Sequence, residues 1–268
     1  MHNHGVIALA SLAAVAMAAP ATAQELAGHR AAYSVNALER GKPAGTAGTY
    51  AFELRQTCDG YVINQRLRLE LQTGRAPVVS EQQSQMTESR DGRRLQFDHR
   101  NTANGRVTST FKGEALLGDD GRGQGRYSEP AGQSVALPQG TLFPVGIARA
   151  AIRHAKAGDG GFDGLFYFGE KVRAPRAVNV VIGRVPRRLA DVVLPSGSEA
   201  LGADRTRLYY RGAFFDTDSK AKTEQAAFEM SSLTLDNGVE LYGTHEEGDG
   251  GIEYRITRLE ALPKPTCN

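Results

Sequence analysis

The sequence lacks a strong charge of either sign. Its 268 residues carry 32 Lys and Arg against 30 Asp and Glu, which gives a formal net charge of +2. Proteins that bind nucleic acid use a concentrated basic face to release counterions from many phosphates. Here the arginines are spread along alternating segments, as is typical of the solvated side of a sheet. The charge balance therefore argues against a nucleic-acid partner.

Long apolar runs are also lacking after the first 23 residues. An uncharged apolar run over residues 6–19 ends in Ala21-Thr22-Ala23, the pattern of a signal-peptidase site. The run is too short for a membrane span, which needs about 20 apolar residues, and no later segment is long or uncharged enough to be one. We expect residues 1–23 to be a signal peptide and 24–268 to form one periplasmic domain without a transmembrane segment. Residues 1–4 contain no Lys or Arg, which is irregular for a signal peptide. A wrongly assigned start or an uncleaved apolar anchor is the alternative.

Cysteine is scarce, and the only two are Cys58 and Cys267. They lack the C-x-x-C spacing of zinc ligands, and neither is placed to carry an amino-terminal lipid anchor. In an exported protein the simplest expectation is a disulfide, because the periplasm is oxidising. Closing a loop of roughly 210 residues removes on the order of 5 kcal/mol of conformational freedom from the unfolded chain. Two unpaired buried thiols are the alternative.

Alternation of apolar and polar residues runs through most of the chain, which is the period of a half-buried strand. Residues 61–71, for example, have leucine at 67, 69 and 71 and charged side chains at 66, 68 and 70. Asn104-Gly105 and Asn237-Gly238 separate such runs and favour tight hairpins. We predict strands over residues 29–38, 48–57, 61–71, 78–88, 93–101, 106–114, 123–128, 164–171, 177–184, 206–216, 225–235, 239–246 and 252–262.

The exception is residues 141–157, where Pro144 stands in a first turn and apolar residues recur at three- and four-residue spacing before Gly158. This pattern predicts one amphipathic helix. A sheet of about a dozen strands must twist, and it curls on itself or splits into two packed sheets. The predicted fold class is therefore all-β, with a strongly curved antiparallel sheet and a single helix.

Catalytic signatures are missing: there is no G-x-S-x-G elbow and no phosphate-binding glycine loop in a strand–helix context. Asp98 and His99 are neighbours in a predicted strand, so they point to opposite faces, and we expect His99 to be exposed. Glu246, Glu247 and Asp249 lie at a glycine-rich hairpin tip, where water is hard to exclude. We expect no catalytic residue, no metal and no cofactor. A hydrolase of envelope components is the least favoured alternative.

Aromatic residues are the better lead, although they make up only 7% of the chain and include no tryptophan. They gather around the predicted helix and the strands after it. A curled sheet can leave an apolar cavity lined by such rings, but the simpler interpretation is that they fill the core. The candidate ligand-binding residues are Phe143, Phe162, Phe166, Phe168, Tyr209 and Phe215.

Four motifs, in this order, resemble the envelope-integrity B (EipB-like) family. They are Thr57-Cys58-Asp59-Gly60, Thr141-Leu142-Phe143-Pro144, Phe162-Asp163-Gly164, and the terminal Leu262-Pro263-Lys264-Pro265-Thr266-Cys267. The resemblance implies a periplasmic β-spiral, an unclosed barrel wrapped around a helix and similar to lipoprotein carriers, with the family's disulfide on Cys58 and Cys267. It also implies a part in maintaining the envelope under stress, without catalysis. One departure is Val145-Gly146-Ile147, where we would expect a polar or His residue.

We therefore predict a non-enzymatic periplasmic protein that supports cell-envelope integrity by binding an apolar peptide, a lipid or a protein partner in its concave face. The alternative is a purely structural interaction protein whose interior is filled by side chains. The two differ in whether the concave face holds a cavity.

Overall fold

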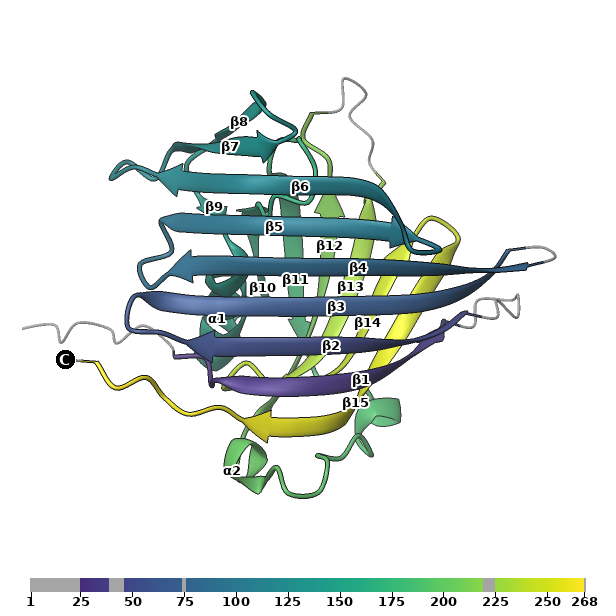
Figure 1. Cartoon of the computed structure of the whole chain (residues 1–268). Coiled ribbons are helices and arrows are strands. Elements are labelled where there is room, and N and C mark those ends of the chain that lie inside the picture. Colours follow the sequence, from purple (N-terminus) through teal and green to yellow (C-terminus); the bar gives the residue numbers. More distant parts are fainter. Residues whose placement is uncertain (1–24, 39–45, 74–75, 219–224, 268) are drawn as a thin grey trace, which may run out of the picture.

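The computed structural model describes residues 25–38, 46–73, 76–218 and 225–267. The expected signal peptide, residues 1–23, lies outside the described residues. Fifteen strands form a single sheet, accompanied by one 14-residue helix and two short helical turns (Figure 1). No helix within the described ranges is long and apolar enough to cross a membrane.

Eight strands follow one another along the first half of the chain. They are β1 (His29–Ala37), β2 (Thr46–Gln56), β3 (Gly60–Thr73), β4 (Ala76–Ser89), β5 (Arg94–Ala103), β6 (Arg106–Leu117), β7 (Gly123–Glu129) and β8 (Ser134–Leu137). Each pairs antiparallel with the next. Asn104 and Gly105, at the turn between β5 and β6, both have positive φ (49° and 76°), as their sequence predicts.

The second half of the chain forms the other part of the sheet. It contains β9 (Thr141–Leu142), α1 (Pro144–Ala157), β10 (Gly161–Phe166), β11 (Arg176–Gly183), η1 (Arg187–Leu189), α2 (Glu199–Gly202), β12 (Arg207–Phe215), β13 (Phe228–Leu235), β14 (Glu240–Glu247) and β15 (Gly250–Ala261). Pairing of β1 with β15 joins the two halves, so the edges of the sheet are β8 and β9. All pairs are antiparallel except β9 with β10.

The sheet curls into an unclosed barrel, with β1–β6 in front and β10–β14 behind in Figure 1 and α1 between these layers. The all-β class, the strong curvature and the single long helix are confirmed. The strand count is higher than the predicted dozen because β8 and β9 have only four and two residues, too few to show alternation. β9 also occupies the start of the predicted helix, and β10 ends at Phe166, earlier than the predicted strand over 164–171.

Helix α1 fills one end of the barrel. Pro144 occupies its first turn, and Gly158 ends it in the left-handed conformation (φ 79°). Its buried Val145 and Ile152 join a core with inward-facing residues of β2–β7 and β12, among them Leu54, Tyr61, Ile63, Met86, Leu95, Phe97, Ala115 and Leu208. We call the sheet face that carries these residues the concave face. The part of the barrel that they fill is the α1 end.

A second core lies around β13–β15, β1 and the segment between β11 and β12. Within it, Leu189 of η1 and Leu201 of α2 are buried with Leu233, Leu235 and Tyr242. The two short helical turns were not predicted, because three or four residues are too few to show a helical period.

Candidate functional site

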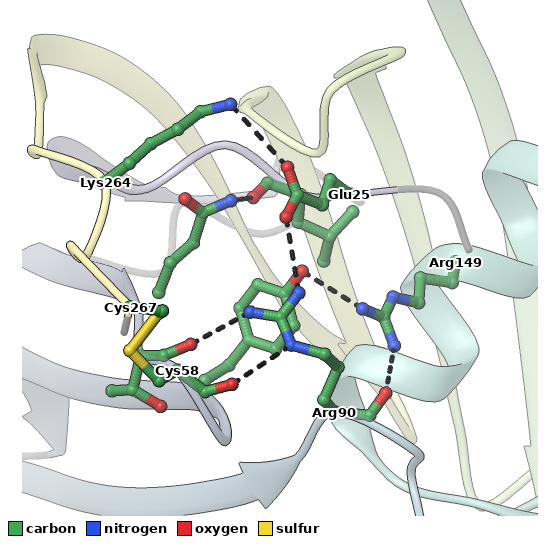
Figure 2. Close-up of polar contacts among 10 residues, drawn as sticks. Glu25, Cys58, Arg90, Arg149, Lys264 and Cys267 are labelled. Carbon is green, nitrogen blue, oxygen red and sulfur yellow. Dashed lines mark hydrogen bonds and ion pairs between the residues drawn. A yellow bond between two sulfur atoms is a disulfide. The ribbon is translucent and has the colours of Figure 1, made fainter. Parts of the chain in front are cut away.

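Cys58 and Cys267 form a disulfide, with a Cα–Cα distance of 5.6 Å, as expected (Figure 2). Arg90 lies beside this disulfide. Its guanidinium donates hydrogen bonds to the backbone oxygens of Thr57 (3.0 Å) and Cys58 (3.3 Å) and to the carboxylate of Glu25 (3.3 Å). These contacts tie the amino-terminal segment, the turn between β2 and β3, and the last residues into one cluster.

The same end of the molecule is fastened to α1. Arg149 of the helix donates to the backbone oxygen of Arg90 and to the hydroxyl of Tyr61, both at 3.0 Å (Figure 2). Glu88 of β4 accepts hydrogen bonds from the backbone N–H groups of Val145 (2.7 Å) and Gly146 (3.0 Å). Burial raises the pKa of Glu88 to about 7, although these two hydrogen bonds and Arg149 act in the opposite direction. The sequence offered one signal for this burial: Glu88 lies two residues after Met86, so both side chains point to the same face of the strand.

Beyond α1 the concave face is partly exposed, although Leu67 and Leu69 pack against the second core. Residues two apart on a strand share a face, so the face that carries Ile63 on β3 continues through Gln65, Leu67 and Leu69. These three side chains are only half-buried, and Gln82, opposite Leu67 on β4, is exposed. Solvent therefore reaches this region, which we call the open end of the concave face.

An aromatic row crosses the open end from β10 to β14. The rings of Phe166 and Phe214 lie 5.7 Å apart, Phe214 stacks on Phe228 at 4.3 Å, and Phe228 stacks on His245 at 4.9 Å. Burial lowers the pKa of His245. A cleft of about 560 Å³ lies nearby between β6 and the loops after β10 and β12, lined by Phe111, Lys171, Val172, Arg173, Asp216 and Asp218.

The six predicted ligand-binding residues do not form one site. Phe143 is 1% exposed in the core at the α1 end. Phe162 stacks on His154 of α1 at 4.8 Å, and Phe166 stacks on Phe168 at 5.7 Å. Tyr209 and Phe215 lie on the convex side of β12, because Leu208 and Phe214 occupy its concave side. The structure places Phe166 in the aromatic row, with Phe168 stacked on it, while Phe214 and Phe228 were missed.

His99 is buried, 3% exposed, and the expectation that it is exposed was wrong. It lies on the concave side of β5, in register with Ser84, and alternation alone does not say which side is concave. Nδ1 lies 2.8 Å from the Ser84 hydroxyl and Nε2 lies 2.8 Å from the backbone oxygen of Phe168. Burial lowers its pKa. As predicted, Asp98 lies on the opposite face, where it pairs with Lys112 at 3.3 Å.

A carboxyl group lies between the α1 end and the open end. Glu240 of β14 accepts hydrogen bonds from the Ser232 and Tyr254 hydroxyls, the latter at 3.3 Å, and its backbone oxygen accepts one from Tyr33 at 3.0 Å. Tyr50 packs against Tyr33 and Tyr254, with ring centroids 5.2 and 5.6 Å away. Burial raises the pKa of Glu240 to about 7. The sequence offered no signal for it, since Glu240 follows a hairpin turn, where a charged residue is normally solvated.

The described residues contain no group of three or more His, Cys, Asp or Glu side chains arranged to hold a metal ion. Both cysteines are in the disulfide, and both ring nitrogens of His99 are engaged.

Comparisons with known proteins agree with this architecture. A family model described as EipB-like matches residues 20–263. A crystal structure of a β-barrel-like protein of a domain of unknown function (DUF1849) from Brucella abortus superposes with a TM-score of 0.78 and 20% sequence identity, covering 90% of this chain and 100% of that one. At this identity the likeness shows the fold alone. No curated protein matches the chain significantly.

Proposed function

The chain belongs to the EipB-like family, and from that premise we propose that it is an exported, non-enzymatic protein that supports cell-envelope integrity by binding a hydrophobic partner on its concave face. Two features support export. Residues 1–23 have the pattern of a signal peptide. The Cys58–Cys267 disulfide belongs in an oxidising compartment such as the periplasm.

The observation that carries the binding proposal is the contrast between the two ends of the concave face. At the α1 end, Leu95 and Ile152 are 0% and 1% exposed, as in any filled core. At the open end, Leu67, Met230 and Ile252 remain half-buried although they point to the same side of the sheet. Apolar surface on a rigid concave scaffold is the usual form of a site for an acyl chain or an apolar peptide. The filled-core alternative predicts instead that these half-buried side chains only complete the cores against which they pack.

The absence of catalysis is part of the proposal. A general base needs a free lone pair within reach of a substrate, and His99 has structural partners on both ring nitrogens. The cysteine sulfurs are bonded to each other and cannot act as nucleophiles.

Native mass spectrometry of the oxidised protein, extracted gently from the periplasm, tests the proposal. We expect a hydrophobic adduct on the wild type that is lost in Leu67→Asp, because a charge on the concave face repels an apolar ligand. Leu116→Asp is the matched control: Leu116 is 43% exposed on the convex side of β6, so its adduct should persist. An empty wild-type protein, or equal retention in both variants, would count against the proposal.

A further inference from the structure

We propose that Glu240 and the tyrosines around it form a binding site for an organic ammonium group, carried by a ligand whose apolar chain lies along the open end of the concave face. This inference names the ligand chemistry of the proposed site, and so it rests on the proposed function. It is argued from three separate observations: a carboxyl group without a cationic partner, aromatic rings packed beside it, and a change from polar to apolar residues along the strands.

The first observation is the missing counter-charge. Throughout the described ranges, no Lys, Arg or His side chain forms an ion pair with Glu240, whose side-chain partners are the Ser232 and Tyr254 hydroxyls. Arg176, on the concave side of β11, is held by Glu170 (2.9 Å) and Asp216 (2.8 Å). Burying a carboxylate without a cation is unfavourable, and a bound cation removes that cost.

The second observation is the set of rings. Tyr33, Tyr50, Tyr210 and Tyr254, from β1, β2, β12 and β15, are the other titratable groups that interact with Glu240. Burial raises the pKa of each, so all four stay neutral and Glu240 alone changes charge. Tyr33 and Tyr254 are 2% and 7% exposed, whereas Tyr50, Tyr210 and Glu240 are half-buried and keep part of their surface exposed. Tyrosine faces attract cations, and a carboxylate beside them adds a direct ion pair.

The third observation gives the ligand a direction. Three strands of the concave face change from polar to apolar residues as they lead away from α1 towards the open end. The pairs are Gln65 then Leu67 on β3, Ser232 then Met230 on β13, and Tyr254 then Ile252 on β15. An amphiphile fits this gradient with its cationic group at Glu240 and its chain towards the open end. A fatty acid does not, because its carboxylate would face that of Glu240.

Three probes with the same six-carbon chain separate charge from hydrophobicity: hexyltrimethylammonium, 1-hexanol and hexanoate. Isothermal titration at pH 8 should show the ammonium probe binding at least tenfold more tightly than hexanoate. Glu240→Gln should lower the affinity for the ammonium probe at least tenfold and leave the affinity for 1-hexanol unchanged. The amide keeps an acceptor for Ser232 and Tyr254, and far-UV circular dichroism verifies the fold. Glu114→Gln, on the convex side of β6, is the matched control and should bind as the wild type does.

A second variant protects the test against misfolding of the first. Tyr50→Leu keeps the carboxyl group and apolar bulk but removes a ring, so it should weaken ammonium binding and spare 1-hexanol. The inference is overturned if folded Glu240→Gln binds the ammonium probe as tightly as the wild type. 1-Hexanol could displace the hydrophobic adduct that Leu67→Asp abolishes while hexyltrimethylammonium binds no more tightly than 1-hexanol. In that case the proposed function stands and the inference fails. If no probe binds, both fail.

Discussion

The Glu88 carboxylate on β4 accepts a 2.7 Å hydrogen bond from the backbone N–H of Val145, 57 residues later in the chain. Phe143, the residue before α1, makes no side-chain hydrogen bond that caps the helix. The first backbone N–H groups of α1 therefore depend on an acceptor from a strand of the sheet. A negative charge also suits the positive end of the helix dipole. Glu88 thus fixes the position of the helix that fills the α1 end.

Replacing Glu88 with alanine should lower the free energy of unfolding by about 2–4 kcal/mol, because two buried N–H groups lose their acceptor. Urea denaturation at pH 7 measures the change. Glu114→Ala is the control: Glu114 pairs with Arg94 at the surface, and its loss should cost less than about 1 kcal/mol. Equal stability of the two variants would show that Glu88 does not act as a cap.

Glu240→Gln should flatten the pH dependence of stability. The folded-state pKa of about 7 lies above the ordinary value of 4.5, so the folded protein holds this proton more tightly than the unfolded chain does. The stabilisation of the fold by this proton is complete below about pH 4.5 and is lost as the pH rises through 7. The free energy of unfolding should therefore fall by about 2–3 kcal/mol between pH 5 and 8 because of Glu240. The measurement is the free energy of unfolding at both pH values.

The comparison between wild type and Glu240→Gln isolates this group. Glu88 titrates in the same direction, while His29, His99 and His245, whose pKa values burial lowers, act in the opposite one. All four are present in both proteins and cancel in the difference. Parallel pH profiles for wild type and variant would exclude an elevated pKa at Glu240.

Local pattern was enough to predict the long strands and their hairpins, because alternation and Asn-Gly turns are local properties. The single disulfide followed from the count of two cysteines and from the expectation that the chain is exported. The buried groups Glu88, His99 and Glu240 did not follow, since alternation shows which residues share a face but not which face is concave. Their partners lie across the barrel, as Phe168 does for His99, and no sequence spacing reveals such contacts.

His99→Ala should lower the free energy of unfolding by about 2–3 kcal/mol, because it leaves the Ser84 hydroxyl and the Phe168 carbonyl without their partner and removes a ring 5.0 Å from that of Phe168. Hydrogen exchange should quicken in residues 167–175, which His99 anchors. Arg100→Ala, exposed next to it, should change neither quantity. Unaltered exchange in that loop would refute the anchoring role.

Breaking the disulfide should lower stability by about 5 kcal/mol, because Cys58 and Cys267 are 209 residues apart and their link restricts most of the unfolded chain. The native contacts do not depend on it: β1 pairs along its whole length with β15, and Arg90 still joins the turn to Glu25. The Cys58→Ser/Cys267→Ser protein should therefore keep its far-UV circular dichroism at 25 °C while unfolding at a lower urea concentration. If the oxidised wild type and the double variant unfold at the same urea concentration, this entropic account is ruled out. If the double variant loses its β signal without denaturant, the disulfide is needed to hold β1 against β15.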